Sequence, residues 1–197
     1  MDIRILDDAG AVAEAAAARM IAQISVRPDA VIAIPTGRTP VEMYRRLTDA
    51  HRAGSLDLGR VRWFALDEFL GVPPDHRGSF RSWLLAHLIR PAQLDPTRLA
   101  TLRGDAPDPD AEVTEYEAKI RAAGGLDLAL LGLGRNGHLA FNEPGTPADS
   151  ATGPRLLTEA TRDANSYLLP GGDVPGWGLS MGLGTLAAAR ALVLMAT

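Results

Sequence analysis

Short apolar runs alternate along the chain with longer segments in which apolar side chains recur every three or four positions. A short run rich in Val, Ile and Leu is typical of a buried strand, whereas the longer spacing is typical of a helix that covers a sheet. We predict strands over residues 2–6 (DIRIL), 30–34 (AVIAI), 61–66 (VRWFAL), 126–133 (LDLALLGL) and 191–197 (ALVLMAT). We predict helices over residues 11–24, 40–53, 79–88, 110–123 and 158–165.

This alternation predicts an α/β fold with three layers, in which an open, mostly parallel sheet carries helices on both faces. Pro40 suits the first turn of the helix over residues 40–53, and Gly54 suits its end. The segment 90–110 is rich in Pro and Asp and indicates a loop with one short strand near residues 99–102. The length of 197 residues fits one domain over residues 1–197.

Three loops follow the carboxyl ends of predicted strands. They are PTGRTP over residues 35–40, DEFLGVPPDHRGSF over residues 67–80, and GRNGHLAFNEPG over residues 134–145. In an open parallel sheet, ligands bind in the crevice beyond these ends. We therefore expect the three loops to converge in space and to form the functional site.

The third loop contains a G-x-G-x-x-G pattern at Gly132, Gly134 and Gly137. A dinucleotide site would need a helix that begins at the third glycine, with its N-terminus facing the pyrophosphate. Pro144 follows shortly afterwards, and no second strand ends in an acidic residue at the required distance. We predict a Rossmann-like sheet without a dinucleotide site, in which glycines such as Gly137 let the backbone turn tightly past a sugar.

The same loop places His138 close in sequence to Asn136 and Glu143. A carboxylate beside an imidazole raises its pKa and fixes its orientation, which suits proton transfer near neutral pH. A structural histidine bonded to a backbone carbonyl is the alternative. The position of His138 after a buried strand favours a catalytic role.

Asp67 and Glu68 directly follow the strand over residues 61–66. An acid at the end of a buried strand loses hydration, so its basicity can rise. The alternative is that an acid here caps the following turn. Because adjacent side chains point to opposite sides, we expect one cap and one catalytic acid.

The first loop has the composition of an anion-binding turn before a helix. Gly37 permits close backbone approach, the hydroxyls come from Thr36 and Thr39, and Arg38 adds a positive charge. The Walker spacing and its lysine are absent, so a nucleotide triphosphate does not fit. A small sugar monophosphate does. A plain strand-to-helix turn remains the alternative, because Gly and Thr are ordinary turn and cap residues.

The composition limits the kinds of partner that the protein is expected to bind. The formal net charge is −4 and the pI is about 5.5, which disfavours general binding to nucleic acids or anionic membranes. The chain has no cysteine, which excludes disulfides, thiolate catalysis and cysteine metal sites. No segment reads as a secretory signal or a membrane span. We expect a cytoplasmic protein, and a homo-oligomer is compatible with the sequence.

Taken together, these motifs resemble the glucosamine-6-phosphate deaminase family, which shares a superfamily with the 6-phosphogluconolactonases. The motifs that carry the resemblance are PTGRTP, LDEFLGVP, GLGRNGHLAFNEPG, LTEATRDANS and MGLGTL. The resemblance implies conversion of glucosamine 6-phosphate and water to fructose 6-phosphate and ammonia, without a metal or organic cofactor. It implies that Asp67 moves a proton between C2 and C1, and that His138 assists ring opening while Glu143 and Asn136 tune it.

The resemblance also implies that the loop from Thr36 to Thr39 holds the 6-phosphate, and here the chain departs from the family twice. Tyr167 stands where the family places an arginine, and the family places a lysine just beyond Thr197, where this chain stops. We expect the family's C-terminal part to be lacking, and Arg38 to compensate for one lost charge. A 6-phosphogluconolactonase-like lactone hydrolase and a non-catalytic sugar-phosphate-binding domain remain alternatives.

Overall fold

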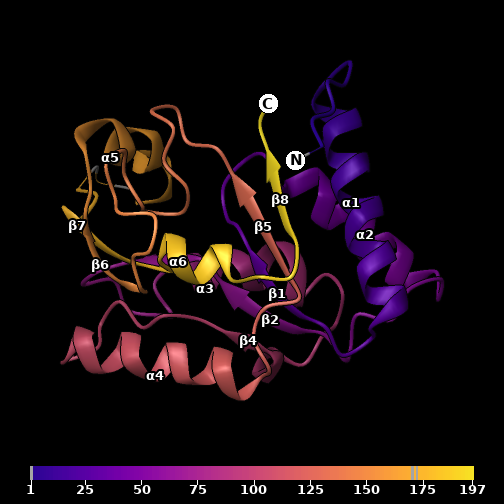
Figure 1. The fold of residues 1–197 in the computed structure, drawn as a ribbon, viewed down its shortest axis with the longest axis horizontal. Helices are drawn as coiled ribbons and strands as arrows, with labels where there is room; N and C mark the ends of the chain where they lie inside the picture. The colour runs from indigo at the N-terminus through magenta and orange to yellow at the C-terminus, as the bar shows by residue number, and fades with distance from the viewer. Residues whose placement is uncertain (1, 170, 172) are drawn as a thin grey trace.

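The computed structural model describes residues 2–169, 171 and 173–197. Its centre is a five-stranded sheet in the order β4-β2-β1-β5-β8, in which all neighbouring strands run parallel (Figure 1). The strands are β1 (Val31–Ile34), β2 (Arg62–Ala65), β4 (Leu99–Ala100), β5 (Leu128–Gly132) and β8 (Leu192–Met195). Each of these five strands lies within a segment that was predicted to contain a strand. The strand predicted at the N-terminus is not among them.

Helices cover both faces of this sheet, which confirms the predicted three-layer α/β fold. One face packs against α1 (Ala9–Val26), α2 (Val41–Arg52), α3 (Phe80–Leu84) and the π-helical turn η1 (Leu85–Ile89). The other face packs against α4 (Pro109–Ala122) and α6 (Leu183–Ala187) (Figure 1). Within β1, Ile32 and Ile34 join the first core, whereas Val31 and Ala33 join the second. This alternation explains why the strand is apolar at every position.

Side-chain caps set the helix starts. The side chains of Ser79, Asp108 and Thr158 each accept a backbone N–H from the first turn of the helix that follows. Pro40 lies one residue before α2, and Gly54 follows that helix with a φ of 72°, a left-handed conformation that glycine adopts without strain. The boundaries predicted from these residues therefore hold to within about two positions.

A second, antiparallel sheet was not predicted. It has the order β3-β7-β6, formed by β3 (Asp67–Phe69), β7 (Trp177–Ser180) and β6 (Gly153–Leu156). The segment after β6 forms α5 (Glu159–Asn165) and the short 3₁₀ turn η3 (Ser166–Leu168). A second 3₁₀ turn, η2 (Pro96–Arg98), precedes β4. Residues 67–69 are thus a short strand rather than the start of a loop, because they pair with β7, a segment distant in the sequence.

The predicted strand over residues 2–6 is wrong. These residues form no regular structure, and Ile3 and Ile5 are 72% and 96% exposed. None of the described strands pairs with this segment, and an unpaired strand has no partner for its backbone N–H and C=O groups. Among the described residues, no helix has the length and apolar character that a membrane crossing requires.

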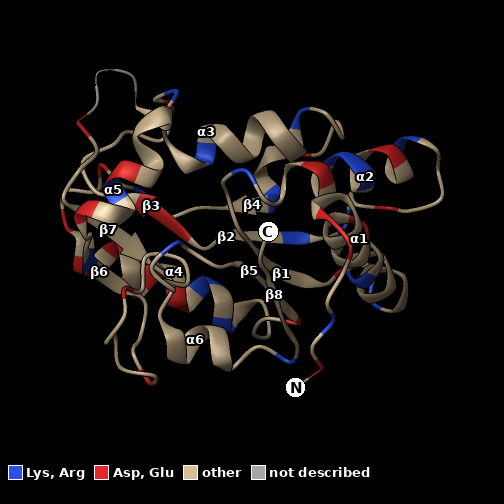
Figure 2. Ribbon diagram, turned by 90° about the horizontal axis from the view of Figure 1, so that it is seen from above, with Lys and Arg blue, Asp and Glu red and all other residues tan. Residues whose placement is uncertain are grey.

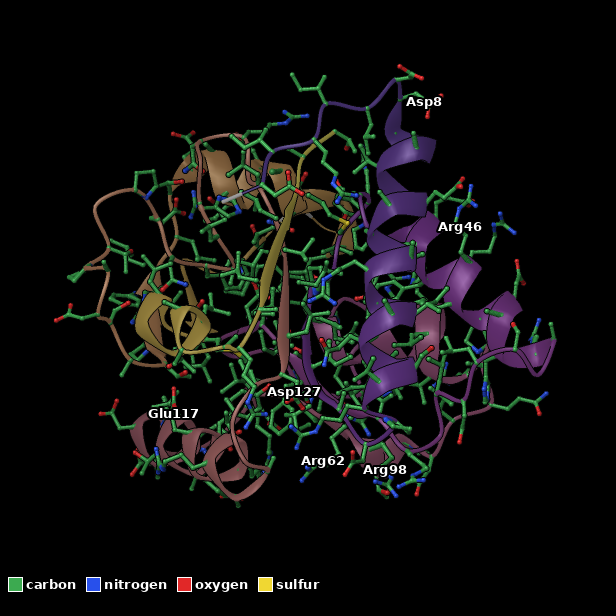
Figure 3. The ribbon with its side chains drawn as sticks, turned by 45° about the vertical axis from the view of Figure 1, so that its right-hand side comes forward. Asp8, Arg46, Arg62, Arg98, Glu117 and Asp127 are labelled. Carbon is green, nitrogen blue, oxygen red and sulfur yellow. The ribbon has the colours of Figure 1, made fainter. Side chains whose placement is uncertain are left out.

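An ion cluster ties the amino ends of the strands together. Asp127, labelled in Figure 3, precedes β5 and is 2% exposed. It accepts hydrogen bonds from Arg27 at 2.6 Å, from the backbone N–H of Val31 at 2.8 Å, and from Arg190. A buried carboxylate is stable only when it is paired in this way. This end of the sheet is therefore structural, and the opposite end carries the candidate site.

Candidate active site

A pocket of about 240 Å³ opens at the carboxyl ends of the strands, and all three predicted loops line it. Figure 2 looks onto this end of the sheet. The polar and charged lining residues are Thr36, Arg38, Thr39, Asp67, Arg135, His138, Asn165 and Tyr167. The expected convergence of the three loops is confirmed. Gly37 also lines the pocket, whereas Gly137, Asn136 and Glu143 stand behind the lining.

The loop around His138 is folded back on itself. The backbone N–H of Gly137 donates to the carbonyl of Gly134 at 2.9 Å, and the N–H of Gly134 donates to the carbonyl of His138 at 2.9 Å. Gly137 has a φ of 90°, which glycine tolerates and other residues rarely adopt. The next helix along the chain is α5, so no helix starts at Gly137 to face a pyrophosphate.

The neighbours of Asn136 fix the tautomer of His138. The Asn136 Nδ2 group donates to Glu143 Oε2 at 2.6 Å, while Oδ1 accepts the backbone N–H of His138 at 3.2 Å. A carboxylate only accepts and an N–H only donates, so the amide has one orientation. Oδ1 also lies 2.8 Å from His138 Nδ1, which must therefore carry a proton. The lone pair of the neutral imidazole is left on Nε2.

Glu143 is held by donors on several sides. Its Oε1 accepts from the backbone N–H of Thr158 at 3.0 Å and from the Thr158 hydroxyl at 3.1 Å. Burial raises the pKa of Glu143. The hydroxyl of Thr161, the backbone N–H of Thr158 and the Asn136 amide together lower this pKa by more, so its net value lies below the ordinary one and the carboxyl stays ionised. Thr158 and Thr161 are site residues that sequence reasoning missed.

The pKa of His138 lies below its ordinary value. Burial of the imidazole lowers the pKa, and the charge of Glu143, whose Oε2 is 4.0 Å from Nδ1, raises it by less. The expectation that a neighbouring carboxylate would raise the pKa is therefore wrong for the net effect. Because Asn136 separates Glu143 from the ring, the carboxylate does not contact the imidazole closely enough to outweigh desolvation. His138 is neutral near pH 7 and can accept a proton.

Asp67 and Glu68 take different parts, as the sequence suggested. Glu68 is fully buried and accepts the backbone N–H groups of Phe69, Phe80 and Arg81, so it caps the start of α3. Burial raises the pKa of Glu68 to about 7, although these donors lower it. Asp67 is 7% exposed and lines the pocket. Burial, and secondly the charge of Glu68, raise the pKa of Asp67 well above its usual value. β3 is the acidic strand labelled in Figure 2.

The loop from Thr36 to Thr39 joins β1 to α2. The Tyr44 hydroxyl donates to the carbonyl of Pro35 at 2.6 Å and fixes the entry to the loop. The guanidinium of Arg38 lies 4.5 Å from the centre of the Tyr167 ring, a cation–π distance. Arg38 forms no ion pair with any residue of the described ranges, so its positive charge is available to a ligand.

A second arginine was missed by sequence reasoning. Arg135 lines the pocket, is exposed, and has no ion pair with the described part of the chain. Its position two residues before Gly137 in the histidine loop was the available signal. Two guanidinium groups and one neutral imidazole thus face a pocket whose acid is Asp67, which favours an anionic ligand. No three His, Asp or Glu side chains within residues 2–169, 171 and 173–197 gather in a metal-binding arrangement.

Comparison with known proteins shows which family and which solved structures the chain matches. The sequence model of the family described as glucosamine-6-phosphate isomerases/6-phosphogluconolactonase matches residues 7–197. A glucosamine-6-phosphate deaminase of Shewanella loihica is 40% identical over 198 aligned residues, which cover 100% of this chain and 74% of the relative. The solved structure of a monomeric glucosamine-6-phosphate deaminase matches with a TM-score of 0.94 and 33% identity, over 98% of this chain and 81% of that one. The 6-phosphogluconolactonase of Trypanosoma brucei shares the fold, with a TM-score of 0.78 and 19% identity over 98% of this chain and 80% of that one.

Proposed function

The chain belongs to the glucosamine-6-phosphate isomerase/6-phosphogluconolactonase family, and we propose that it is an enzyme that converts glucosamine 6-phosphate and water to fructose 6-phosphate and ammonia. The observation that carries this proposal is the pairing of Asp67 and His138 in one pocket. The two side chains come from different strands of the fold, one from β3 and the other from the loop after β5. A buried carboxyl and a neutral imidazole supply the two proton transfers that the reaction needs.

Ring opening is the role we assign to His138. The pyranose opens when the proton of the O1 hydroxyl leaves and the ring oxygen O5 receives a proton, which gives a free aldehyde at C1. Nε2 of His138 has the free lone pair, so it can take the first proton and deliver it to O5. The lowered pKa keeps the imidazole neutral before this step. The oriented Asn136 amide and the ionised Glu143 stabilise the positive charge that forms on the ring.

Isomerisation and loss of ammonia follow, with Asp67 as the base. Its ionised carboxylate removes the proton from C2 of the open-chain amino aldehyde, whose amino group is protonated, while a proton passes from the ammonium nitrogen to O1. This gives a neutral enolamine across C1 and C2. Return of that proton to C1 leaves an imine at C2, and addition of water to the imine releases ammonia and forms the ketone. The raised pKa of Asp67 makes its carboxylate a stronger base for the C2 proton.

The loop from Thr36 to Thr39 is our candidate phosphate site. It offers backbone N–H groups at the start of α2, two hydroxyls and the guanidinium of Arg38. Arg38 stands over Tyr167, the residue that replaces the arginine expected from the family resemblance. We assign to Arg38 the charge that this replacement removes. Gly137, also predicted to bind substrate, stays a prediction because it lies outside the pocket lining.

The test is a paired product assay. The protein is incubated with glucosamine 6-phosphate, and ammonia and fructose 6-phosphate are measured together; the two products should form in equal amounts. Asp67→Asn should abolish both products because the amide cannot accept the C2 proton. If Asp67→Asn retains wild-type turnover, the mechanism is wrong.

The same experiment separates the alternatives. Hydrolysis of 6-phosphogluconolactone without any ammonia from the amino sugar would support a lactone hydrolase, and binding of sugar phosphate without turnover would support a sensor. The structural likeness to the lactonase speaks for the fold alone, whereas the deaminase relatives match at 40% identity along the whole chain. We further propose a cytoplasmic location, where phosphorylated sugars are made and consumed. The homo-oligomer stays a prediction.

A further inference from the structure

We propose that Thr161 is a positioning residue whose hydroxyl holds the imidazole of His138 in place. This proposal rests on the proposed function, because it assigns Thr161 a part in the same proton transfer. It concerns a side chain that does not line the pocket and acts only through His138.

The geometry places the hydroxyl against the ring. Thr161 Oγ1 lies 3.1 Å from His138 Nδ1, and the residue is 1% exposed. Thr161 sits in the first turn of α5, where its backbone N–H donates to Thr158 Oγ1 at 3.2 Å. Its main chain is therefore fixed by the helix cap, independently of its own hydroxyl.

The direction of each hydrogen bond follows from the tautomer. Because Nδ1 of His138 carries the proton, Thr161 Oγ1 is an acceptor toward the ring, alongside Asn136 Oδ1. Thr161 Oγ1 also lies 3.2 Å from the hydroxyl of Thr158, the residue that caps α5. Two acceptors thus hold the Nδ1–H group of His138, the amide oxygen of Asn136 and the hydroxyl oxygen of Thr161.

Both hydrogen bonds from Nδ1 strengthen when the ring becomes positively charged. Hydrogen bonds to an ionised donor are about twice as strong as neutral ones. The charged groups around the ring are Glu143, with Oε2 4.0 Å from Nδ1, and the charged residues that line the pocket together with His138, namely Asp67, Arg38 and Arg135. Thr161 therefore favours the imidazolium over the neutral ring, and it holds the ring at the angle that presents Nε2.

A purely structural role for the threonine predicts something different. Thr161→Val has nearly the same shape and keeps the backbone bond to Thr158, so it removes only the hydroxyl. Thr161→Ser keeps the hydroxyl and removes only the methyl group. Thr48→Val is the matched control, because Thr48 is 4% exposed and its hydroxyl has no hydrogen-bond partner in the described part of the chain.

The experiment combines kinetics with a direct titration of the ring. In Thr161→Val we expect kcat for glucosamine 6-phosphate to fall about tenfold and KM to change less than twofold, because one hydrogen bond to the imidazolium is lost. The acid limb of the kcat profile should move to lower pH. Nitrogen-15 NMR of His138 in the free protein should show a lower pKa and a weakened preference for the Nδ1–H tautomer. Thr161→Ser and Thr48→Val should match the wild type.

The outcomes separate this proposal from the proposed function. Thr161→Val with an unchanged His138 titration would overturn the proposal, as would a loss in Thr161→Ser equal to that in Thr161→Val. The NMR titration needs no turnover, so it tests the contact even if the protein does not deaminate glucosamine 6-phosphate. A shifted titration in a protein that releases no ammonia would support the contact and refute the reaction.

Discussion

Gly134→Ala should disable the site by displacing His138. A Cβ atom built on Gly134 would lie 2.3 Å from Cε1, 2.4 Å from Nδ1 and 2.4 Å from Nε2 of the imidazole. Carbon atoms in contact need about 3.5 Å, so the ring would have to retreat by about 1 Å. That movement breaks the 2.8 Å bond between Nδ1 and Asn136. A displacement of this size in a catalytic group costs on the order of a hundredfold in rate, or about 2.7 kcal/mol.

The assay is kcat/KM for glucosamine 6-phosphate, with urea unfolding measured on the same samples. Overpacking should also lower the free energy of unfolding by about 1–3 kcal/mol. Gly176→Ala is the control, because a Cβ there meets no atom within 4 Å and the residue lies outside the pocket lining. If Gly134→Ala kept more than a third of the kcat/KM of Gly176→Ala, with unchanged NMR signals from His138, the inferred contact would be refuted.

Three further changes test the other groups. Burial raises the pKa of Glu68 from 4.5 to about 7, so the folded state binds this proton more tightly than the unfolded state does. The free energy of unfolding should therefore fall by about 3 kcal/mol as the pH rises from about 4.5 to 7. In Glu68→Gln, urea titrations at these pH values should show a free energy of unfolding without this decrease. Arg38→Ala should raise KM for glucosamine 6-phosphate at least tenfold with little change in kcat, whereas Tyr167→Phe, which keeps the ring, should leave KM within about threefold; equal KM values would contradict a phosphate contact. Thr48→Val removes a buried hydroxyl that has no hydrogen-bond partner among the described residues, so urea unfolding should show unchanged or higher stability, by up to about 1 kcal/mol; a loss above about 1 kcal/mol would contradict this reading of the hydroxyl.

The parallel sheet could be predicted because its strands are buried on both faces. In β1 and β5 every side chain that packs is apolar, so the run itself reveals the strand. The second sheet gives no such signal. β6 contains Pro154 and the exposed Leu156, and it pairs only with β7, which matches the confinement of proline to edge strands. Its existence depends on pairing between segments distant in the sequence, which local pattern does not encode.

The candidate site, like the fold, contains residues that the local sequence pattern predicts and residues that it does not. Asp67 and His138 were predictable because each lies in a segment that follows a buried strand, and the carboxyl ends of parallel strands meet at one edge of the sheet. Thr161 was not predictable, because its contact with the ring depends on how α5 folds over the histidine loop. The threonines at the cap and third position of that helix were visible as a helix start, and a helix start explains them without any catalytic neighbour. The net pKa of His138 was also out of reach, because it is a balance of burial against one carboxylate.

The three glycines of the histidine loop arise from requirements unlike those of a cofactor loop. In a dinucleotide site the third glycine admits a helix against the strand, whereas here Gly137 closes a turn by donating to the carbonyl of Gly134, with a φ of 90°. Gly134 is needed because the imidazole of His138 occupies the space of its missing side chain. Nothing within 4 Å demands glycine at Gly132, which ends β5 beside the pocket. The spacing from Gly134 to Gly137 is therefore the spacing of a turn that returns the chain so that its next side chain, His138, lies against its own beginning. An alanine at Gly134 would clash with the imidazole ring, whereas an alanine at Gly137 would strain the backbone, which has a positive φ there. The pattern thus accounts for the position of the His138 imidazole, and no helix follows it as a pyrophosphate site would require.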